Sequence, residues 1–158
     1  MSELKDAARR VQERAAGLGL EIEVRQMPAS TRTAVDAAAA CGCGVGQIVK
    51  SLVFKGRTSG KPYLLLVSGS NRVDEKGVAA VIGEALTRPD AQFVRDVTGY
   101  AIGGIPPLGH DTPLATYFDR DLMQYDVVWA AAGTPESVFA ASPSQLAEKT
   151  GATVISMG

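Results

Sequence analysis

The chain has 158 residues, of which 46% are hydrophobic and 21% charged, proportions typical of one globular domain with a substantial core and not of a disordered or fibrous chain. Sixteen basic and seventeen acidic residues give a net charge of -1 without any block of like charges, so a contact with nucleic acid is expected to be local, and DNA is not an expected partner. No apolar run approaches the roughly 20 residues of a membrane span, and MSELKDAARR is typical of a charged helix and not of a signal peptide. We therefore expect a cytoplasmic protein without a membrane partner.

The two cysteines, Cys41 and Cys43, stand too close together in CGCG for an ordinary stabilising disulfide loop. Free thiols packed near a helix end are expected, since nothing in the sequence places a general base beside them; a redox switch or a thiol nucleophile is the alternative. With His110 as the single histidine, the chain has few soft ligands for a closed zinc site. We expect neither a metal nor a cofactor.

The first elements are a helix, a strand and a second helix. Apolar residues recur at helical spacing from Leu4 to Leu18, with Ser2 as a candidate N-cap and glycines after the last turn. LEIEVRQM, residues 20–27, alternates apolar and polar residues and predicts a strand with one wet face. Thr33 followed by Asp36 resembles a capping box, and predicts a helix that continues to the CGCG glycines.

The segment GQIVKSLVFK, residues 46–55, predicts a covered strand that contains a charge. Because side chains alternate along a strand, Lys50 shares its face with Ile48, Leu52 and Phe54. Leaving an ammonium there desolvated and unpaired costs several kcal/mol, so Lys50 must snorkel, pair or line a cavity. GRTSGK then predicts a hairpin to the almost wholly apolar strand PYLLLVSG.

The rest of the chain adds three helices and four strands. Asp74, Asp90 and Ser142 are expected to cap helices, the second ending at Gly99 and the third beginning with Pro143. The strands are expected in LATYFD, YDVVWAAAG, SVFAAS and ATVIS. The order favours an α/β protein of the α+β type, with a mixed, largely antiparallel sheet or partial barrel flanked by helices, in one domain over residues 1–158.

The loop GGIPPLG, residues 103–109, is the second unusual segment. Paired glycines allow close approach of a ligand to the backbone, and Pro106 and Pro107 stiffen the chain and remove two N–H donors. Such a loop is suited to holding a carbonyl or anion with fixed N–H groups, as in an oxyanion hole. A rigid turn between two strands is the alternative.

The two segments together resemble a known family. GQIVKSLVFK, followed some fifty positions later by TGYAIGGIPPLGH, is similar to the YbaK/prolyl-tRNA synthetase-associated domain family of aminoacyl-tRNA deacylases. The resemblance extends over nearly the whole chain, through STRTAVDAAAACG, NRVDEKG and VVWAAAG. It implies the family fold, a mixed sheet flanked by helices. It also implies hydrolysis, in trans to the synthetase, of the ester that joins a wrong amino acid to the terminal ribose of tRNA.

The resemblance also implies residue roles. Lys50 falls on the lysine that such proteins need for activity, and the family's Gly-x-x-x-Pro loop maps onto Gly103 through Pro107. We expect Lys50 to orient the ester or the terminal phosphate and to stabilise negative charge, assisted by the amides around Gly103 and Gly104. An aminoacyl ester is already activated, so no serine or cysteine nucleophile and no metal is needed. The expected partners are the acceptor end of mischarged tRNA and an aminoacyl-tRNA synthetase.

Further candidate substrate-binding residues lie in and around these segments: Thr31, Thr33, Ile105, Pro106, Pro107 and His110. Two of them have another explanation, since Thr33 also suits a helix cap and His110 also suits a structural or exposed position. Asn71, Arg72 and Lys76 form a small polar cluster that suits either a tRNA contact or a solvated turn.

Two rival functions remain open from the sequence alone. One is a module without catalytic activity that binds aminoacyl-tRNA or a synthetase and uses Lys50 as an anchor. The other is a hydrolase for a small ester or amide unrelated to tRNA. The identity of the amino acid and of the tRNA does not follow from the residues.

Overall fold

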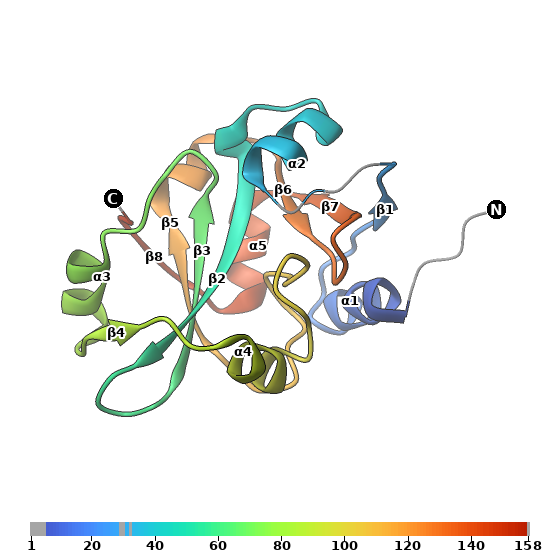
Figure 1. Ribbon diagram of the computed structural model, residues 1–158. Coiled ribbons are helices and arrows are strands. Elements are labelled where there is room, and N and C mark those ends of the chain that lie inside the picture. The colour runs from blue at the N-terminus through green and yellow to red at the C-terminus, as the bar shows by residue number, and fades with distance from the viewer. Residues whose placement is uncertain (1–5, 29–30, 32, 158) are drawn as a thin grey trace.

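One open sheet of eight strands organises the molecule (Figure 1). The computed structural model describes residues 6–28, 31 and 33–157. The strands are β1 (Arg25–Gln26), β2 (Ile48–Gly56), β3 (Pro62–Ser68), β4 (Leu86–Thr87), β5 (Ala115–Asp119), β6 (Val128–Ala131), β7 (Ser137–Ala141) and β8 (Thr153–Ile155). The helices are α1 (Asp6–Gly17), α2 (Ala34–Cys41), α3 (Glu75–Ile82), α4 (Ala91–Thr98) and α5 (Pro143–Thr150), with the 3-10 helices η1 (Val45–Gln47) and η2 (Arg120–Gln124).

The strand order is β1-β7-β6-β2-β3-β5-β8, and β4 pairs separately with β2. In the described part of the chain, β1–β7, β2–β3, β2–β4 and β6–β7 pair antiparallel, while β2–β6, β3–β5 and β5–β8 pair parallel. The mixed, mostly antiparallel sheet with flanking helices confirms the predicted fold class. Because β1 and β8 end the strand order and do not pair with each other in the described residues, the sheet is open and does not close into a barrel.

Side-chain caps fix the helix ends where the sequence predicts them. The side chains of Thr33, Asp74, Asp90 and Ser142 each accept a hydrogen bond from a backbone N–H in the first turn of α2, α3, α4 and α5. Pro143 occupies the first turn of α5, and Gly99 ends α4. The predicted cap at Ser2 lies outside the described residues.

The prediction for residues 20–27 was largely wrong. Leu20 and Val24 are buried, as the alternation requires, but only Arg25–Gln26 pairs with a strand. The N–H of Val24 instead donates to the side chain of Gln12 in α1, at 3.0 Å. Alternating burial therefore arose here from packing against a helix, without a partner strand. The sequence analysis also missed the short β4 and both 3-10 helices.

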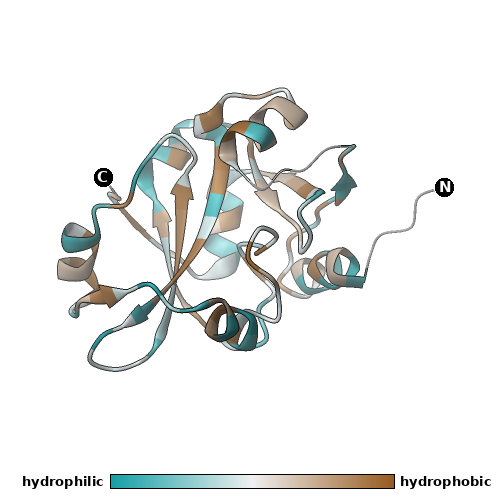
Figure 2. Ribbon diagram, in the orientation of Figure 1, coloured by the Kyte–Doolittle hydropathy of each residue, from teal (hydrophilic) through white to brown (hydrophobic). Residues whose placement is uncertain are grey.

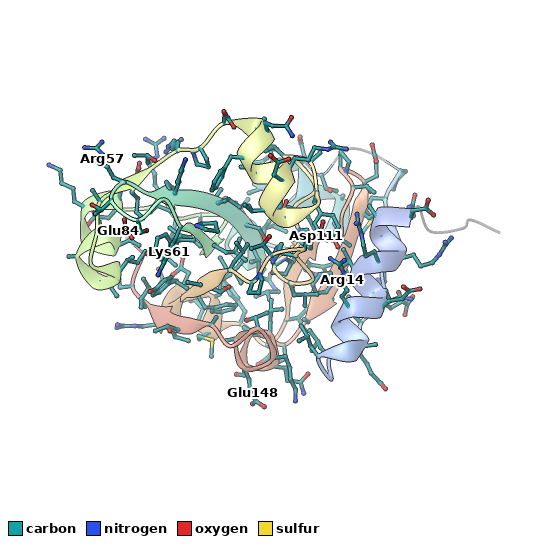
Figure 3. All side chains as sticks on the ribbon, turned by 90° about the horizontal axis from the view of Figure 1, so that it is seen from below. Arg14, Arg57, Lys61, Glu84, Asp111 and Glu148 are labelled. Carbon is teal, nitrogen blue, oxygen red and sulfur yellow. The ribbon has the colours of Figure 1, made fainter. Side chains whose placement is uncertain are left out.

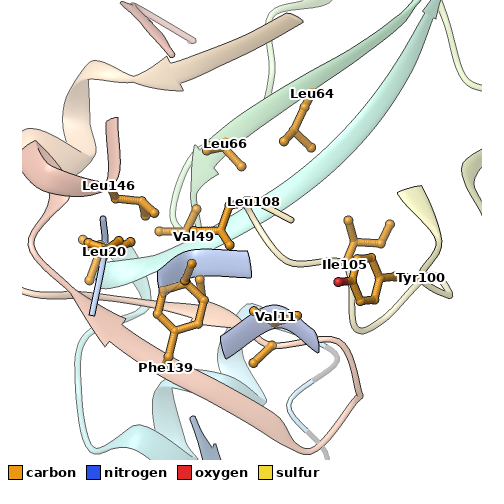
Figure 4. Packing of buried hydrophobic residues seen from close by; sticks show 14 of the residues in the cluster. Val11, Leu20, Val49, Leu64, Leu66, Tyr100, Ile105, Leu108, Phe139 and Leu146 are labelled. Atoms are coloured by element: carbon orange, nitrogen blue, oxygen red, sulfur yellow. The ribbon is translucent and has the colours of Figure 1, made fainter. Parts of the chain in front are cut away.

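The strand β3 separates two hydrophobic clusters. Leu64 and Leu66 point into the larger cluster, which includes residues of α1, α5 and the 100–108 segment (Figure 4). Tyr63, Leu65 and Val67 point into the other cluster, beneath α3 and β4. Figure 2 shows the matching apolar colour along β3. A strand buried on both faces explains the nearly continuous apolar run PYLLLVS.

A single glutamate holds the β2–β3 hairpin. The Glu84 carboxylate, which lies beside the hairpin in Figure 3, accepts hydrogen bonds from the N–H groups of Thr58 and Ser59 and from the hydroxyls of Ser59 and Tyr63, at 2.6 to 3.0 Å. The Ser59 hydroxyl and N–H, then the Tyr63 hydroxyl, lower the pKa of Glu84 to about 2. These contacts predict a pH-dependent contribution to stability.

Glu84→Gln is therefore expected to lower Tm at pH 7 but not at acidic pH. Because the folded-state pKa lies below that of the unfolded chain, the stabilisation is fully present above about pH 4.5 and is lost as pH falls through about 2. Thermal melts from pH 7 to pH 2 check this, with the exposed Glu13→Gln as the charge-matched control. A Tm difference that persists unchanged at pH 2 would show that the charge of Glu84 contributes nothing.

Candidate active site

A cavity opens along one edge of β2, where the sheet splits. On that edge β2 pairs with β6 only through Ile48–Val49 and with β4 only through Lys55–Gly56. In the described part of the chain, the β2 residues between these pairs have no strand neighbour on that side, so their backbone edge faces the opening, and Lys50, Ser51 and Leu52 line it. The first cavity, of about 440 Å³, lies there and is lined by Thr31, Thr33, Ala34, Ala37, Ile48, Val49, Lys50, Ser51, Leu52, Ile102, Gly103, Ile105, Trp129, Ala130, Ala131 and Val138.

Among the described residues that line this cavity, Lys50 is the one with a cationic side chain. On its face of β2, Ile48 packs under α2 and Phe54 packs under α3 and β4. Lys50 lies between these two covered positions, half-buried, and its ammonium donates to the Asn71 carbonyl at 2.5 Å. Of the three outcomes that the sequence allows for this charge, the structure shows a side chain that lines a cavity and has a hydrogen-bond partner.

The environment of Lys50 changes its acidity. Burial lowers the pKa of its ammonium below the ordinary value, the attraction of Asp119 acts in the opposite direction, and the repulsion of Arg72 adds to the lowering. An ammonium that is partly desolvated interacts more strongly with negative charge than one in water. Lys50 is thus suited to binding a carbonyl oxygen or phosphate in the cavity.

Gly103 presents backbone to the same cavity. It has φ +103°, a left-handed conformation that favours glycine, and lies in a turn closed by the hydrogen bond from Gly104 N–H to the Ala101 carbonyl, at 3.1 Å. Gly103 N–H donates no hydrogen bond to another described residue. The Gly103 amide is thus available as a donor as far as the described residues are concerned, whereas the Gly104 amide is engaged within the turn.

Gly104 has a packing role behind the cavity wall. A Cβ at Gly104 would lie 2.8 Å from three backbone atoms of Thr134, and the Gly104 carbonyl accepts from Gly133 N–H at 2.8 Å. The absence of a side chain thus allows the loop to lie directly on the β6–β7 connection. Gly104 fixes the position of Gly103 without lining the cavity itself.

The structure separates the predicted site residues into two groups. Thr31, Thr33, Lys50, Gly103 and Ile105 line the first cavity. Pro107 and His110 instead line a second cavity of about 550 Å³, with Arg14 of α1 and Lys149 of α5. Pro106 is buried and lines neither. The loop passes between the two cavities, so neighbours in sequence face opposite sides of it.

His110 anchors the loop from the far side. Its Nε2 lies 2.7 Å from the Pro106 carbonyl, which as an acceptor requires an N–H at that nitrogen, and its ring meets Tyr100 edge-on. Burial lowers the pKa of the imidazole, and the Pro106 carbonyl opposes this. Arg14 donates to the Gly109 carbonyl and to Asp111 (Figure 3). These contacts hold the loop on the side away from the first cavity, where His110 lies.

The two threonines of the first cavity have partners within the chain. The Thr31 hydroxyl donates to the Pro135 carbonyl at 2.6 Å, and the Thr33 hydroxyl accepts from Asp36 N–H at 3.1 Å. These hydrogen bonds fix the two threonines in the cavity wall, Thr31 against Pro135 and Thr33 at the start of α2. Ser51, which the sequence analysis did not select, also lines the cavity and has a buried hydroxyl without a partner among the described residues.

The cysteines are poor nucleophiles in this fold. Burial, with a smaller contribution from Cys43, raises the pKa of the Cys41 thiol to about 11, against a lowering by Arg25. Burial also raises the pKa of Cys43. Both are free thiols.

Within the described ranges, no three His, Cys, Asp or Glu side chains gather closely enough to hold a metal ion. No helix in these ranges is long and apolar enough to cross a bilayer.

Comparison with known proteins defines the class. The family model for the aminoacyl-tRNA editing domain matches residues 28–149, which include the first cavity and the glycine-proline loop. The chain therefore belongs to the aminoacyl-tRNA editing domain family, and the resemblance seen in the sequence is confirmed.

Individual relatives extend this result. A crystal structure described as a “putative trans-editing enzyme for prolyl tRNA synthetase” is 49% identical, with a TM-score of 0.93 and 98% of each chain covered. Another, of the hypothetical protein APE2540, is 29% identical, with a TM-score of 0.86, over 94% of this chain and 98% of that one. The “Putative Cys-tRNA(Pro)/Cys-tRNA(Cys) deacylase EbsC” of Enterococcus faecalis is 28% identical over 116 residues, 66% of this chain and 69% of its own.

Proposed function

We propose that this protein is an aminoacyl-tRNA deacylase that hydrolyses, in trans, the ester of a small amino acid attached to the wrong tRNA. The observation that carries the proposal is that Lys50 and Gly103, whose N–H has no hydrogen-bond partner among the described residues, line one cavity in a chain of the editing family. The names of two relatives, which mention prolyl-tRNA synthetase and Cys-tRNA(Pro), favour tRNA(Pro) as the carrier. We place this activity in the cytoplasm, where tRNA is charged.

The proposed reaction uses water as the nucleophile. A water oxygen attacks the ester carbonyl, the carbon–oxygen bond to the ribose breaks, and the ribose oxygen takes up a proton, which leaves free amino acid and uncharged tRNA. The Gly103 N–H holds the carbonyl oxygen as negative charge develops, and Lys50 orients the ester or the terminal phosphate and adds a positive charge. Neither high-pKa thiol takes part.

The cavity wall supports a small substrate side chain. Ala34 and Ala37 of α2 and Ala130 and Ala131 of β6 contribute only methyl groups, while Trp129 and Ile102 add larger apolar surfaces. A synthetase pocket separates amino acids that differ by a methyl group only about 10- to 200-fold, so small side chains are those that need a second site for editing.

Release of labelled amino acid from a panel of charged tRNAs tests the proposal. The panel contains tRNA(Pro) charged with alanine, cysteine, serine, threonine and proline, with alanyl-tRNA(Ala) and cysteinyl-tRNA(Cys) alongside. Rapid release of one or more small amino acids from tRNA(Pro), with the prolyl ester left intact, is expected. Absence of release from every member by a folded protein would contradict a deacylase and leave a module that binds aminoacyl-tRNA or a synthetase.

A comparison of a small and a large substrate distinguishes the proposed function from the second rival, a hydrolase for small esters or amides. Aminoacyl-adenosine carries the same ester as the tRNA but lacks its acceptor stem. The proposal expects hydrolysis of this minimal ester to be slower than that of the charged tRNA by at least about 10-fold, because binding energy from the rest of the tRNA is lost. Equal rates on both would identify a small-ester hydrolase.

A further inference from the structure

The most buried carboxylate near the cavity has no role in the reaction described above. Asp119 ends β5 and is only 1% exposed. It accepts three hydrogen bonds at 2.9 Å: its Oδ2 from Ser68 N–H and from the Asn71 side-chain amide, and its Oδ1 from Asp121 N–H. A carboxylate this deeply buried is costly to desolvate, and these three donors offset that cost.

Asn71 connects this carboxylate to the lysine. Its side-chain NH₂ donates both to Asp119, at 2.9 Å, and to Asp121, at 2.7 Å. Its backbone carbonyl accepts from the Lys50 ammonium at 2.5 Å. Both donor positions of the amide and the carbonyl of one residue are thus engaged, and Asn71 is held in a single orientation between two strands and η2.

The charges around Lys50 come from three elements. Asp119 of β5 attracts the ammonium, and Arg72, in the segment before α3, repels it. Asp121 of η2 meets the Asn71 amide on its outer side. Without the Asp119 carboxylate, the ammonium would have the repulsion of Arg72 and the burial penalty without the opposing attraction. The same carboxylate therefore supports Lys50 both through a chain of hydrogen bonds and through its charge.

We propose that Asp119 is a positioning residue for the Lys50 ammonium, which it holds at the cavity through the fixed side chain and carbonyl of Asn71. This inference rests on the proposed function for its catalytic consequence, since it states how the lysine of that site is oriented. Asp119 itself is not among the residues that line the cavity, so its part in the reaction is through Lys50.

Asp119→Asn tests the inference because it keeps the shape of the side chain. The amide removes the negative charge, and its NH₂ faces either Asp121 N–H or the pair formed by Ser68 N–H and the Asn71 amide, so at least one of the hydrogen bonds that fix Asp119 and Asn71 is also lost. We expect kcat for aminoacyl-tRNA to fall about 10- to 100-fold while KM changes by less than about 3-fold. Asp126→Asn, which removes the same charge from an exposed position, is the control and is expected to keep the wild-type rate.

A second readout does not depend on activity. The pKa of Lys50 is measured from the ¹³Cε chemical shift in lysine-labelled protein, with Lys50→Arg to identify the signal. Loss of the Asp119 attraction is expected to lower this pKa in Asp119→Asn and to leave it unchanged in Asp126→Asn. A wild-type pKa together with a wild-type kcat in Asp119→Asn would overturn the inference.

Asn71→Ala covers the case in which Asp119→Asn does not fold. It removes the amide that links Asp119 to Lys50 but keeps the accepting carbonyl, and it changes a partly exposed residue. A lower kcat with a shifted Lys50 pKa supports the inference, and an unchanged value of both overturns it. If the wild-type protein releases no amino acid from any tRNA, the proposed function fails, and the Lys50 titration alone still decides whether Asp119 controls the lysine.

Discussion

Lys50→Ala is expected to abolish release of the amino acid while the thermal melt stays close to that of the wild type. Lys50 supplies the positive charge among the described residues that line the first cavity, and removal of such a group from a preorganised site reduces kcat by about 100- to 1000-fold. The stability effect is small because the half-buried ammonium gives up one hydrogen bond and is also relieved of its desolvation penalty. Single-turnover deacylation measures the expected loss of activity, and a thermal melt measures the expected small change in stability.

Lys55→Ala is the matched control for this experiment. Lys55 lies on the same strand, but its ammonium stacks on Phe93 at 4.8 Å from the ring centroid and does not line the first cavity. The control is expected to keep the wild-type rate. A Lys50→Ala protein that retains activity, or a Lys55→Ala protein that loses as much, would remove Lys50 from the proposed mechanism.

Gly103→Ala is expected to cause the second large loss of activity. At φ +103° an alanine is strained by about 1–3 kcal/mol, so the turn moves and its N–H leaves the position from which, in the proposed reaction, it meets the ester carbonyl. We expect kcat/KM to fall at least about 10-fold and Tm to fall by several degrees. Deacylation rates and thermal melts of the same preparation measure the two effects.

Gly83→Ala separates strain from function. Gly83 has nearly the same φ, +102°, and a Cβ there meets no atom within 4 Å, but it ends α3 and does not line the cavity. This variant is expected to lower Tm by a similar amount and to keep the wild-type kcat/KM. If both variants lost activity in proportion to their loss of stability, the Gly103 amide would have no specific part in the reaction.

Sequence reasoning found Lys50 because the signal is local. A charge inside an apolar strand is visible within ten residues, and the alternation of side chains is enough to show that it needs a partner or a cavity. Asp119 gave no such signal. Its burial depends on Ser68 and Asn71, which lie about fifty positions away and meet it only because β3 and β5 pair in parallel.

The glycine-proline loop shows that residues close together in sequence need not face the same cavity. Gly103 and His110 are close in sequence, and both were predicted to serve one site, but the loop runs between two cavities and turns them to different sides. The turn at Gly103 and the hydrogen bond between His110 and the Pro106 carbonyl decide this, and neither is visible in the pattern of residue types. For residues 20–27 the strand prediction was largely wrong, since burial against α1 has the same alternation as a strand.

Binding of an amide-linked aminoacyl-adenosine, which cannot be hydrolysed, tests the central claim most directly. Backbone ¹H–¹⁵N chemical shifts of the wild-type protein report on both cavities in one titration. The account predicts the largest changes at Gly103, Ser51 and Ile105, around the first cavity, with little change at Leu108 and His110. Changes centred on His110 and the second cavity, with Gly103 unaffected, would contradict it.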